Sequence, residues 1–158
     1  MTTPCLAQDL RRDEGLSLTA YPDPLSGSAP WTIGYGHTGP EVRQGLVWTP
    51  AEAETALIAD IARACERLDT HAPWWRRLDD PRQDVLANLC FNMGWGDPAG
   101  IHGLGSFHHT LEAIRCGRWQ EAHDGLLDSA WAREVGARAR RLAAQILTGA
   151  RAPQKEAA

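Results

Sequence analysis

Long apolar runs are missing from this sequence. None of its 158 residues lies in an uninterrupted apolar stretch that approaches the roughly 18 residues needed for a membrane-spanning helix. Residues 1–10 also lack the charged and then apolar pattern of a secretory signal. We therefore expect a protein that is made in the cytoplasm and does not insert into a membrane by itself.

Paired cysteines and metal-ligand clusters are also missing. The four cysteines are far apart in sequence and form no CxxC pair: Cys5, Cys65, Cys90 and Cys116. In a reducing compartment they are expected to be free thiols, mostly small buried apolar side chains. His102, His108 and His109 are close in sequence, but the further ligands of a zinc site are not evident. We expect neither a metal nor a cofactor.

An excess of positive charge is absent as well. The net charge is −4, which argues against a general nucleic-acid binder. The charge is uneven, because residues 131–158 hold six basic and two acidic side chains. This basic end could contact anionic lipid or wall polymer. A helical nucleic-acid or partner-binding protein that uses the arginine-rich end stays open as an alternative.

The distribution of glycine and proline divides the chain. Residues 6–14 are predicted to form a helix that stops at Gly15. Residues 16–48 are rich in both glycine and proline, which favours turns and short strands. Residues 151–158 are expected to be a flexible tail.

Helical patterns fill the rest of the chain. Thr49 is predicted to cap a helix, with Pro50 at its first position and Glu52 completing a capping box. An apolar stripe at helical spacing follows: Ala53, Leu57, Ile61, Ala64 and Leu68. Further helices are expected from Pro81 through Met93, over 107–114, 118–127 and 139–146. The predicted fold is α+β, a single domain over 1–150 with a small β lobe (16–48), a larger helical lobe (1–15 and 49–150) and a ligand cleft between them.

Two carboxylates in the first part of the chain are candidates for acid-base chemistry. Glu14 lies at the carboxyl end of the first helix, where the negative end of the helix dipole disfavours an ionised carboxylate. A carboxyl group that keeps its proton near neutral pH can protonate a leaving oxygen. Asp23 stands between two prolines in a turn, and a second carboxylate is what glycoside hydrolysis requires.

A third candidate segment covers residues 31–37, with the sequence WTIGYGH. If this is one strand, alternation places Thr32, Gly34 and Gly36 on one face. The two glycines would then let a bulky ligand approach the backbone. The side chains on the opposite face, including that of His37, would pack inward.

Together these segments resemble the active-site signature of phage-type lysozymes, the T-even kind. The resemblance runs in order along nearly the whole chain, through the segments 13–15 (DEG), 21–23 (YPD), 32–37 (TIGYGH), 88–94 (NLCFNMG), 118–122 (RWQEA) and 138–141 (RARR). It implies a two-lobed α+β fold and hydrolysis of the β-1,4 bond after N-acetylmuramic acid in peptidoglycan.

The resemblance also implies roles for individual residues. The residue matching Glu14 is the general acid, the one matching Asp23 positions or activates water, and the one matching Thr32 holds that water. Supporting roles, with Gly34, Asn92 and Thr110 along the sugar cleft, His37 packed inward and Arg138 paired with Glu14 or its neighbour, follow by family position. Asn92 and Thr110 could instead be caps, and Arg138 part of a solvated helix face.

The sequence departs from the family in two loops. Eight residues separate Asp23 from Thr32, more than is usual, and fewer follow between His37 and Thr49 than in some members. We expect the extra residues around Ser26 and Ser28 to bulge outward, because a loop absorbs an insertion at little cost. Either serine could share the water-holding role.

These observations predict an endolysin, a monomeric muramidase that lyses a bacterial host. It would act on peptidoglycan glycan strands in the periplasm, after leaving the host cytoplasm through a membrane permeabilised by another protein. A catalytically dead wall-binding module, an enzyme for chitin-like polymers and a lytic transglycosylase remain alternatives. The stereochemical outcome, inverting in most family members, is also left open.

Overall fold

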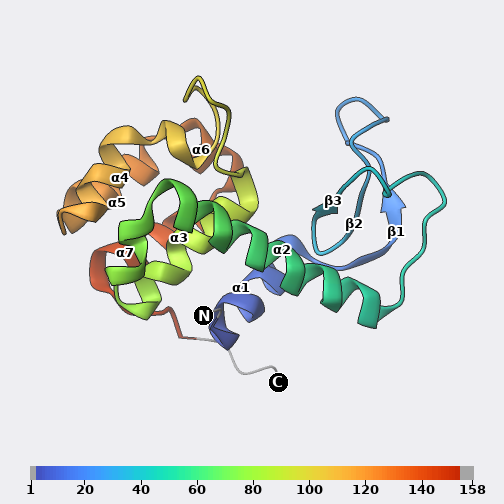
Figure 1. Ribbon diagram of the computed structural model, residues 1–158, viewed down its shortest axis with the longest axis horizontal. Helices are drawn as coiled ribbons and strands as arrows, with labels where there is room; N and C mark the ends of the chain where they lie inside the picture. The colour runs from blue at the N-terminus through green and yellow to red at the C-terminus, as the bar shows by residue number, and fades with distance from the viewer. Residues whose placement is uncertain (1–2, 154–158) are drawn as a thin grey trace. The chain divides into compact units, whose positions relative to one another are not determined.

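The computed structural model describes residues 3–153, which form a short antiparallel sheet and many helices (Figure 1). The elements in chain order are α1 (Pro4–Glu14), β1 (Ser17–Tyr21), β2 (Thr32–Gly34), β3 (His37–Thr38), α2 (Pro50–His71), the 3-10 helix η1 (Pro73–Arg77), α3 (Asp80–Met93), the 3-10 helix η2 (Leu104–Ser106), α4 (His108–Arg115), α5 (Trp119–Leu127), α6 (Ala130–Val135) and α7 (Ala137–Thr148). This arrangement confirms the predicted α+β class.

The chain divides into two compact units, and the boundary between them falls within α2. The first is Met1–Arg63 and the second is Ala64–Ala158. By their contacts, α1 and the first part of α2 belong with the sheet, whereas the sequence analysis placed them with the helices. The single domain over 1–150 stays a prediction.

Helix α1 is defined by caps at both ends. The hydroxyl of Thr3 accepts a hydrogen bond from the backbone N–H of Leu6 at 3.1 Å, and Pro4 occupies the first turn, where its missing N–H costs nothing. At the other end Gly15 has a positive φ of 68°, and its N–H donates to the carbonyl of Arg11. The predicted stop at Gly15 is confirmed, and Glu14 is the last helical residue.

The sheet has the order β1-β2-β3, with both pairs antiparallel. Tyr21 is paired with Thr32 and Ser17 with Gly34, so β1 contains extra residues that make a bulge. Segment 46–48 covers the free edge of β1 through backbone hydrogen bonds. The apolar core of this unit consists of Ala20, Ile33 and Val42, with Trp31, Leu46 and Trp48 packed against it.

Of the two interpretations of residues 31–37, one continuous strand or a glycine-rich bulge, the continuous strand is wrong. Strand β2 ends at Gly34 and β3 begins at His37, with a turn between them. Gly34 and Gly36 have φ values of +64° and +72°, a backbone region that interrupts a strand. The alternation argument therefore does not hold beyond Ile33.

Helix α2 begins as predicted with a capping box. The hydroxyl of Thr49 accepts from the N–H of Glu52 at 3.2 Å, and the Glu52 carboxylate accepts from the N–H of Thr49 at 2.7 Å. The predicted stripe is confirmed, because all of its members are buried: Ala53, Leu57, Ile61, Ala64 and Leu68.

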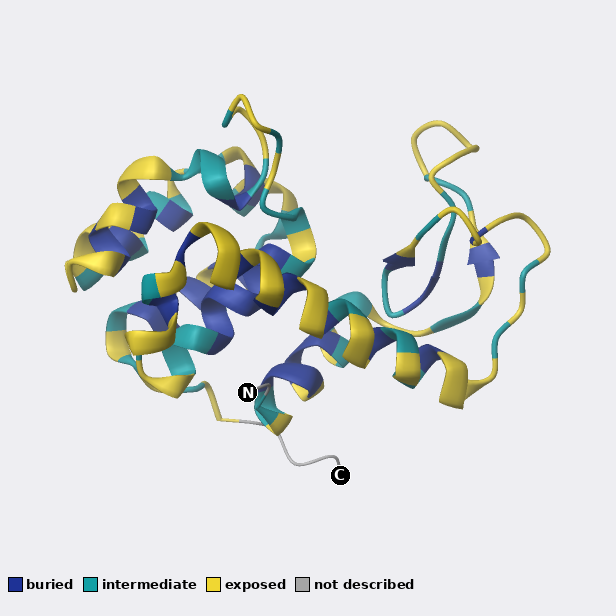
Figure 2. Cartoon of the chain, in the orientation of Figure 1, coloured by how far each residue is buried: buried dark blue, intermediate teal, exposed yellow. Residues whose placement is uncertain are grey.

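Helix α3 is buried on all of its faces through its middle turns. All residues from Asp84 to Cys90 are buried, visible as the dark blue segment in Figure 2. Helix α7 contacts both α3 and α5, and α4 contacts α5. The short elements η1, η2 and α6 were not predicted, since they are too brief to show a periodic pattern.

The segment expected to be a flexible tail begins with an anchored residue. Arg151 donates to the carboxylate of Asp84 in α3, from Nε at 2.9 Å and Nη2 at 2.6 Å. This contact corrects the prediction for Arg151, which lies against the helical core. Residues 154–158 of the expected tail lie outside the described residues.

The four cysteines are free thiols, as expected. Cys65 and Cys90 are buried, Cys5 is half-buried and Cys116 is exposed. Burial raises the pKa of the Cys90 thiol to about 11, which keeps it protonated and unreactive. Across residues 3–153, no helix is both long and apolar enough to span a membrane.

Candidate active site

Glu14 is held at the junction between α1 and the sheet. It ends α1, and a Cβ atom built on Gly36 would lie 2.8 Å from its Oε2. The carboxylate therefore lies next to the α-carbon of Gly36, and a side chain at this position would have to displace it. Gly36 also has a φ of +72°, a backbone conformation that strongly favours glycine. The turn between β2 and β3 thus borders the carboxylate of the candidate acid.

An ion pair anchors α1 to α2 one turn before Glu14. The guanidinium of Arg11 donates to both carboxylate oxygens of Glu54, with Nε at 3.1 Å from Oε2 and Nη2 close to Oε1. Hydrogen bonding to Arg11 lowers the pKa of Glu54, and the same bond raises the pKa of Arg11. This pair was not predicted, because nothing in the local sequence pattern indicates that Glu54 approaches α1.

Thr32 lies in the central strand of the sheet. Its backbone is paired with Tyr21 on one side and with Thr38 on the other. Its neighbour Ile33 is fully buried in the core, whereas Thr32 is half-buried. The register places Thr32 beside Tyr21, two residues before Asp23, so the sheet brings the two predicted water-holding residues to the same end of the β1-β2 hairpin.

Asp23 is part of a closed turn formed by the extra residues. Its carboxylate Oδ2 accepts from the backbone N–H of Ser26, three residues on, at 3.0 Å. Its own N–H donates to the carbonyl of Ser28 at 2.9 Å, and its carbonyl accepts from Gly27 at 2.8 Å. Residues 24–30 are all exposed, with Leu25 97% exposed at the tip. The predicted outward bulge is confirmed, while Asp23 itself stays half-buried.

His37 is buried between two carboxylates. Its Nδ1 lies 2.7 Å from Oδ2 of Asp60 in α2, and its Nε2 lies 2.6 Å from Oε1 of Glu41. Desolvation alone would lower the pKa of the imidazole, but the hydrogen bonds to Glu41 and Asp60 outweigh it and raise the pKa. The inward packing predicted for His37 is confirmed, and its bond to Asp60 fixes β3 to α2.

Gly34 is explained by packing within the first unit. A Cβ at this position would lie 3.0 Å from the ring of Trp48 and 3.5 Å from Cβ of Ala53. Gly34 is buried and the space beside its α-carbon is filled by protein. The substrate contact expected there stays a prediction that this packing does not favour.

The remaining predicted residues belong to the second unit. Arg138 is buried rather than on a solvated face, and donates from Nε and Nη2 to Oδ1 of Asn88 at 3.0 and 2.8 Å. Asn92 is exposed, and its Oδ1 accepts from the indole N–H of Trp131 at 2.7 Å. Thr110 is buried in α4, with its hydroxyl close to the α-carbon of Gly125 in α5.

Asn92, Thr110 and Arg138 therefore differ in the role that each can have. Asn92 offers an oriented amide at the surface, which suits a sugar contact. Thr110 packs two helices together, and it is neither a cap nor accessible. Arg138 and Asn88 form a buried polar pair that orders α3 and α7. Among residues 3–153, no group of three His, Cys, Asp or Glu side chains is arranged to hold a metal ion.

Comparison with known proteins identifies the family of this chain. The model of the phage lysozyme family matches residues 11–146, a range that contains Glu14, Asp23 and Thr32. The chain belongs to the phage lysozyme family. The resemblance seen in the short sequence motifs is thereby confirmed over most of the chain.

Three relatives show how the family domain is used elsewhere. The chain is 31% identical over 168 residues to the pre-baseplate central spike protein Gp5 of Enterobacteria phage T4, covering 91% of this chain and 28% of that protein. It is 29% identical to the SAR-endolysin of Enterobacteria phage P21, covering 53% of this chain and 48% of the relative. A probable T4-type lysozyme 1 of Dictyostelium discoideum is 24% identical, covering 89% and 92%. The chain thus spans a quarter to a half of the length of the first two.

Proposed function

We propose that this phage lysozyme family member is a muramidase that hydrolyses the β-1,4 bonds between N-acetylmuramic acid and N-acetylglucosamine in peptidoglycan. Glu14 is the general acid that protonates the leaving oxygen, and Asp23 and Thr32 position the attacking water. The observation that carries the proposal is the packing of the Glu14 carboxylate against Gly36, the turn residue that follows the strand holding Thr32.

The reaction needs a donor on one side of the scissile bond and a held water on the other. A glutamate fixed by a glycine turn is positioned to donate a proton without a change of rotamer. One oxygen of Asp23, Oδ2, accepts from the Ser26 N–H, so the other oxygen, Oδ1, is the one assigned to water. The hydroxyl of Thr32, one strand away, supplies the second hydrogen bond to that water.

The decisive experiment replaces Glu14 by Gln and measures clearing of bacteria whose peptidoglycan has been exposed. A fold that is unchanged by circular dichroism, together with a loss of roughly 100-fold or more in rate, is expected for removal of a general acid. Activity close to that of the parent protein would refute the assignment. Mass spectrometry of the digest should show reducing-end N-acetylmuramic acid, whereas anhydro-muramic products would mean a lytic transglycosylase.

The biological role that we propose is lysis of a bacterial host by a monomeric endolysin. Such an enzyme would leave the host cytoplasm through a permeabilised membrane and act in the periplasm. Envelope contact by the basic end would depend on exposed side chains such as Arg133 and Arg140, since Arg138 and Arg151 are engaged within the protein.

A second role is favoured by one comparison. The relative with 31% identity is a central spike protein, of which this chain matches only 28%. The same lysozyme unit could therefore work as part of a phage particle. Immunoblotting separates the two roles, because a particle component copurifies with virions and a lytic enzyme stays in the soluble lysate.

A further inference from the structure

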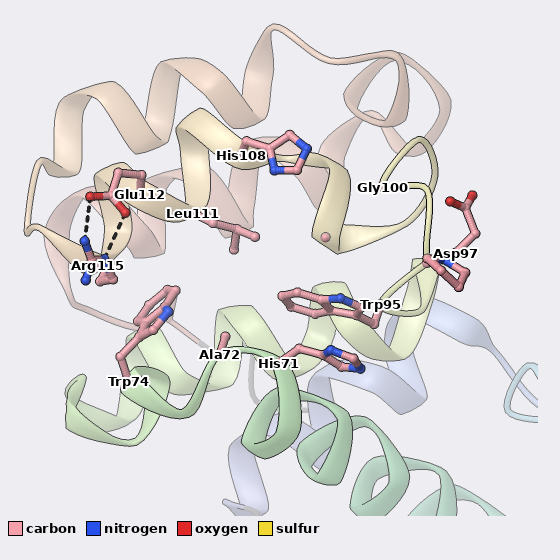
Figure 3. A pocket seen from close by; sticks show the side chains of 13 residues that line it. His71, Ala72, Trp74, Trp95, Asp97, Gly100, His108, Leu111, Glu112 and Arg115 are labelled. Atoms are coloured by element: carbon pink, nitrogen blue, oxygen red, sulfur yellow. Dashed lines mark hydrogen bonds and ion pairs between the residues drawn. The ribbon is translucent and has the colours of Figure 1, made fainter.

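The second unit contains a large hollow that the proposed chemistry does not use. It lies between the end of α2, η1, the loop over 94–105 and α4, and its volume is about 900 Å³ (Figure 3). This volume falls within the range of small-molecule sites. Its aromatic and polar walls include Trp74, Trp95, His108, Glu112 and Arg115. All three candidate catalytic residues belong to the first unit.

Trp95 forms a fixed platform at one side of the hollow. One face of its indole is stacked on His71, with ring centroids 4.9 Å apart and an angle of 7° between the planes. Its pyrrole edge abuts Gly105, where a Cβ would lie 2.8 Å from Nε1. The Trp95 carbonyl also accepts from the N–H of Gly105 at 2.7 Å. Figure 3 shows the opposite face of the ring turned toward the open space below His108 and Leu111.

The loop that carries Trp95 is closed on itself. The N–H of Leu104 donates to the carbonyl of Gly94 at 2.9 Å, and Nδ1 of His102 lies 2.8 Å from the carboxylate of Asp97. A Cβ on Gly96 would overlap the carbonyl oxygen of His102, so the two arms of the loop touch through backbone. A platform held in this way before a ligand arrives costs little conformational entropy on binding.

At the far end of the hollow, a bidentate ion pair holds polar groups in defined positions. Arg115 donates from Nε and Nη2 to the two oxygens of Glu112, at 2.9 and 2.8 Å, and both side chains are exposed on α4 (Figure 3). Trp74 lies beside this pair. The lining contains acidic and basic side chains together, with no dominant sign of charge. This mixture suits an uncharged ligand that has one apolar face and many hydroxyl or amide groups at its edge.

We propose that this hollow is a secondary binding site for the uncharged pyranose rings of a glycan strand. A pyranose offers a flat C–H face to Trp95 and hydroxyl groups to Glu112, Arg115 and His108. The choice of glycan rests on the proposed function, since that strand is the polymer the enzyme would cut. A second binding site for the same polymer raises the effective concentration of cleavable bonds at Glu14.

The test uses the full chain with Glu14→Gln, which leaves the glycan intact, and N-acetylchitotetraose as the soluble probe. Titration is followed by the indole N–H signal of Trp95 in heteronuclear NMR, assigned with Trp95→Phe. A saturable shift of this signal is expected. No shift at millimolar probe, or a shift with a soluble stem peptide and not with the saccharide, overturns the proposal.

Variants then test the site on purified sacculi by cosedimentation. Trp95→Ala removes the platform, and His108→Trp fills the hollow from an exposed position of α4. Each is expected to weaken binding about fivefold or more, the scale of one aromatic contact. His109→Trp is the matched control, because His109 is the exposed neighbour on the same helix and does not line the hollow. If Trp95→Ala does not fold, His108→Trp decides, and binding equal to that of His109→Trp refutes the site.

The two proposals fail separately. Release of reducing ends from sacculi by the parent enzyme tests the muramidase activity and does not depend on the Trp95 signal. Loss of the NMR shift with hydrolysis intact would remove only the secondary site. A shift without hydrolysis would leave a glycan-binding site and remove the proposed function.

Discussion

The carboxylate of Glu14 lies against the α-carbon of Gly36, so close that a methyl group at Gly36 would sit 2.8 Å from Oε2. The last residue of α1 and the turn between β2 and β3 are therefore matched to each other. The position of the candidate acid depends on a residue that takes no part in the chemistry.

Gly36→Ala is the first test of this relationship. The added methyl group must displace the Glu14 carboxylate, and a positive φ costs a non-glycine residue about 1–2 kcal/mol. We expect activity to fall roughly 10- to 100-fold, since small displacements of a catalytic group are costly. Gly45→Ala is the control, because Gly45 has a φ of +85° and nothing within 4 Å of the added atom. It should lose comparable stability and keep its activity; equal activity losses in the two variants would contradict the relationship.

Asp23→Ala is the second prediction and tests the role of the turn. Loss of the water-positioning carboxylate is expected to remove most of the activity, measured as reducing-end release from sacculi. Ser26→Ala should lose little, because Asp23 is held by the backbone N–H of Ser26 and not by its hydroxyl. Ser28→Ala is expected to behave in the same way. If either serine variant proved as damaging as Thr32→Ala, the water-holding role would belong to the inserted turn.

The third prediction concerns stability as a function of pH. The hydrogen bonds of His37 to Glu41 and Asp60 raise its pKa above the unfolded value of about 6.5, so the folded protein binds the proton more tightly. This contribution is fully present below about pH 6.5 and is lost as pH rises through the folded pKa. The melting temperature of the parent protein should therefore fall between about pH 6 and 8 by more than that of His37→Asn. Parallel curves for the two proteins would show that His37 does not titrate as inferred.

The sequence predicted best what is decided within a few residues. The capping box of Thr49 and Glu52 and the stop at Gly15 involve atoms three or four residues apart. The residues that define each sequence motif are therefore the same residues that make the contact. The candidates Glu14, Asp23 and Thr32 were found from motifs, because the family constrains short segments around them.

The sequence predicted less well what depends on distant contacts. Alternation over residues 31–37 holds only if they form one strand, but Gly34 packs against Trp48 and Gly36 lies next to Glu14, neither of which is a sequence neighbour. Arg138 has the spacing of a solvated helix face, yet it is buried against Asn88, 50 residues away. A polar residue selected by a partner in another helix cannot be recognised from local periodicity.

The last prediction concerns Arg151, the first residue of the expected tail. Asp84 is only 5% exposed, and its carboxylate accepts two hydrogen bonds from Arg151. Arg151→Ala removes a charged partner from this buried carboxylate, and removal of one member of a buried pair costs about 3–5 kcal/mol. Because Arg151 is partly exposed, we expect a drop in unfolding free energy just below that range, about 2–3 kcal/mol, measured in urea. Deletion of residues 151–158 removes the same partner of Asp84 and should also destabilise the protein. Asp84→Asn in the Arg151→Ala background should recover part of the loss, because an uncharged amide is less costly to bury. If Arg151→Ala were as stable as the parent protein, the ion pair between Arg151 and Asp84 would contribute nothing measurable to stability, and the anchoring role of Arg151 would be refuted.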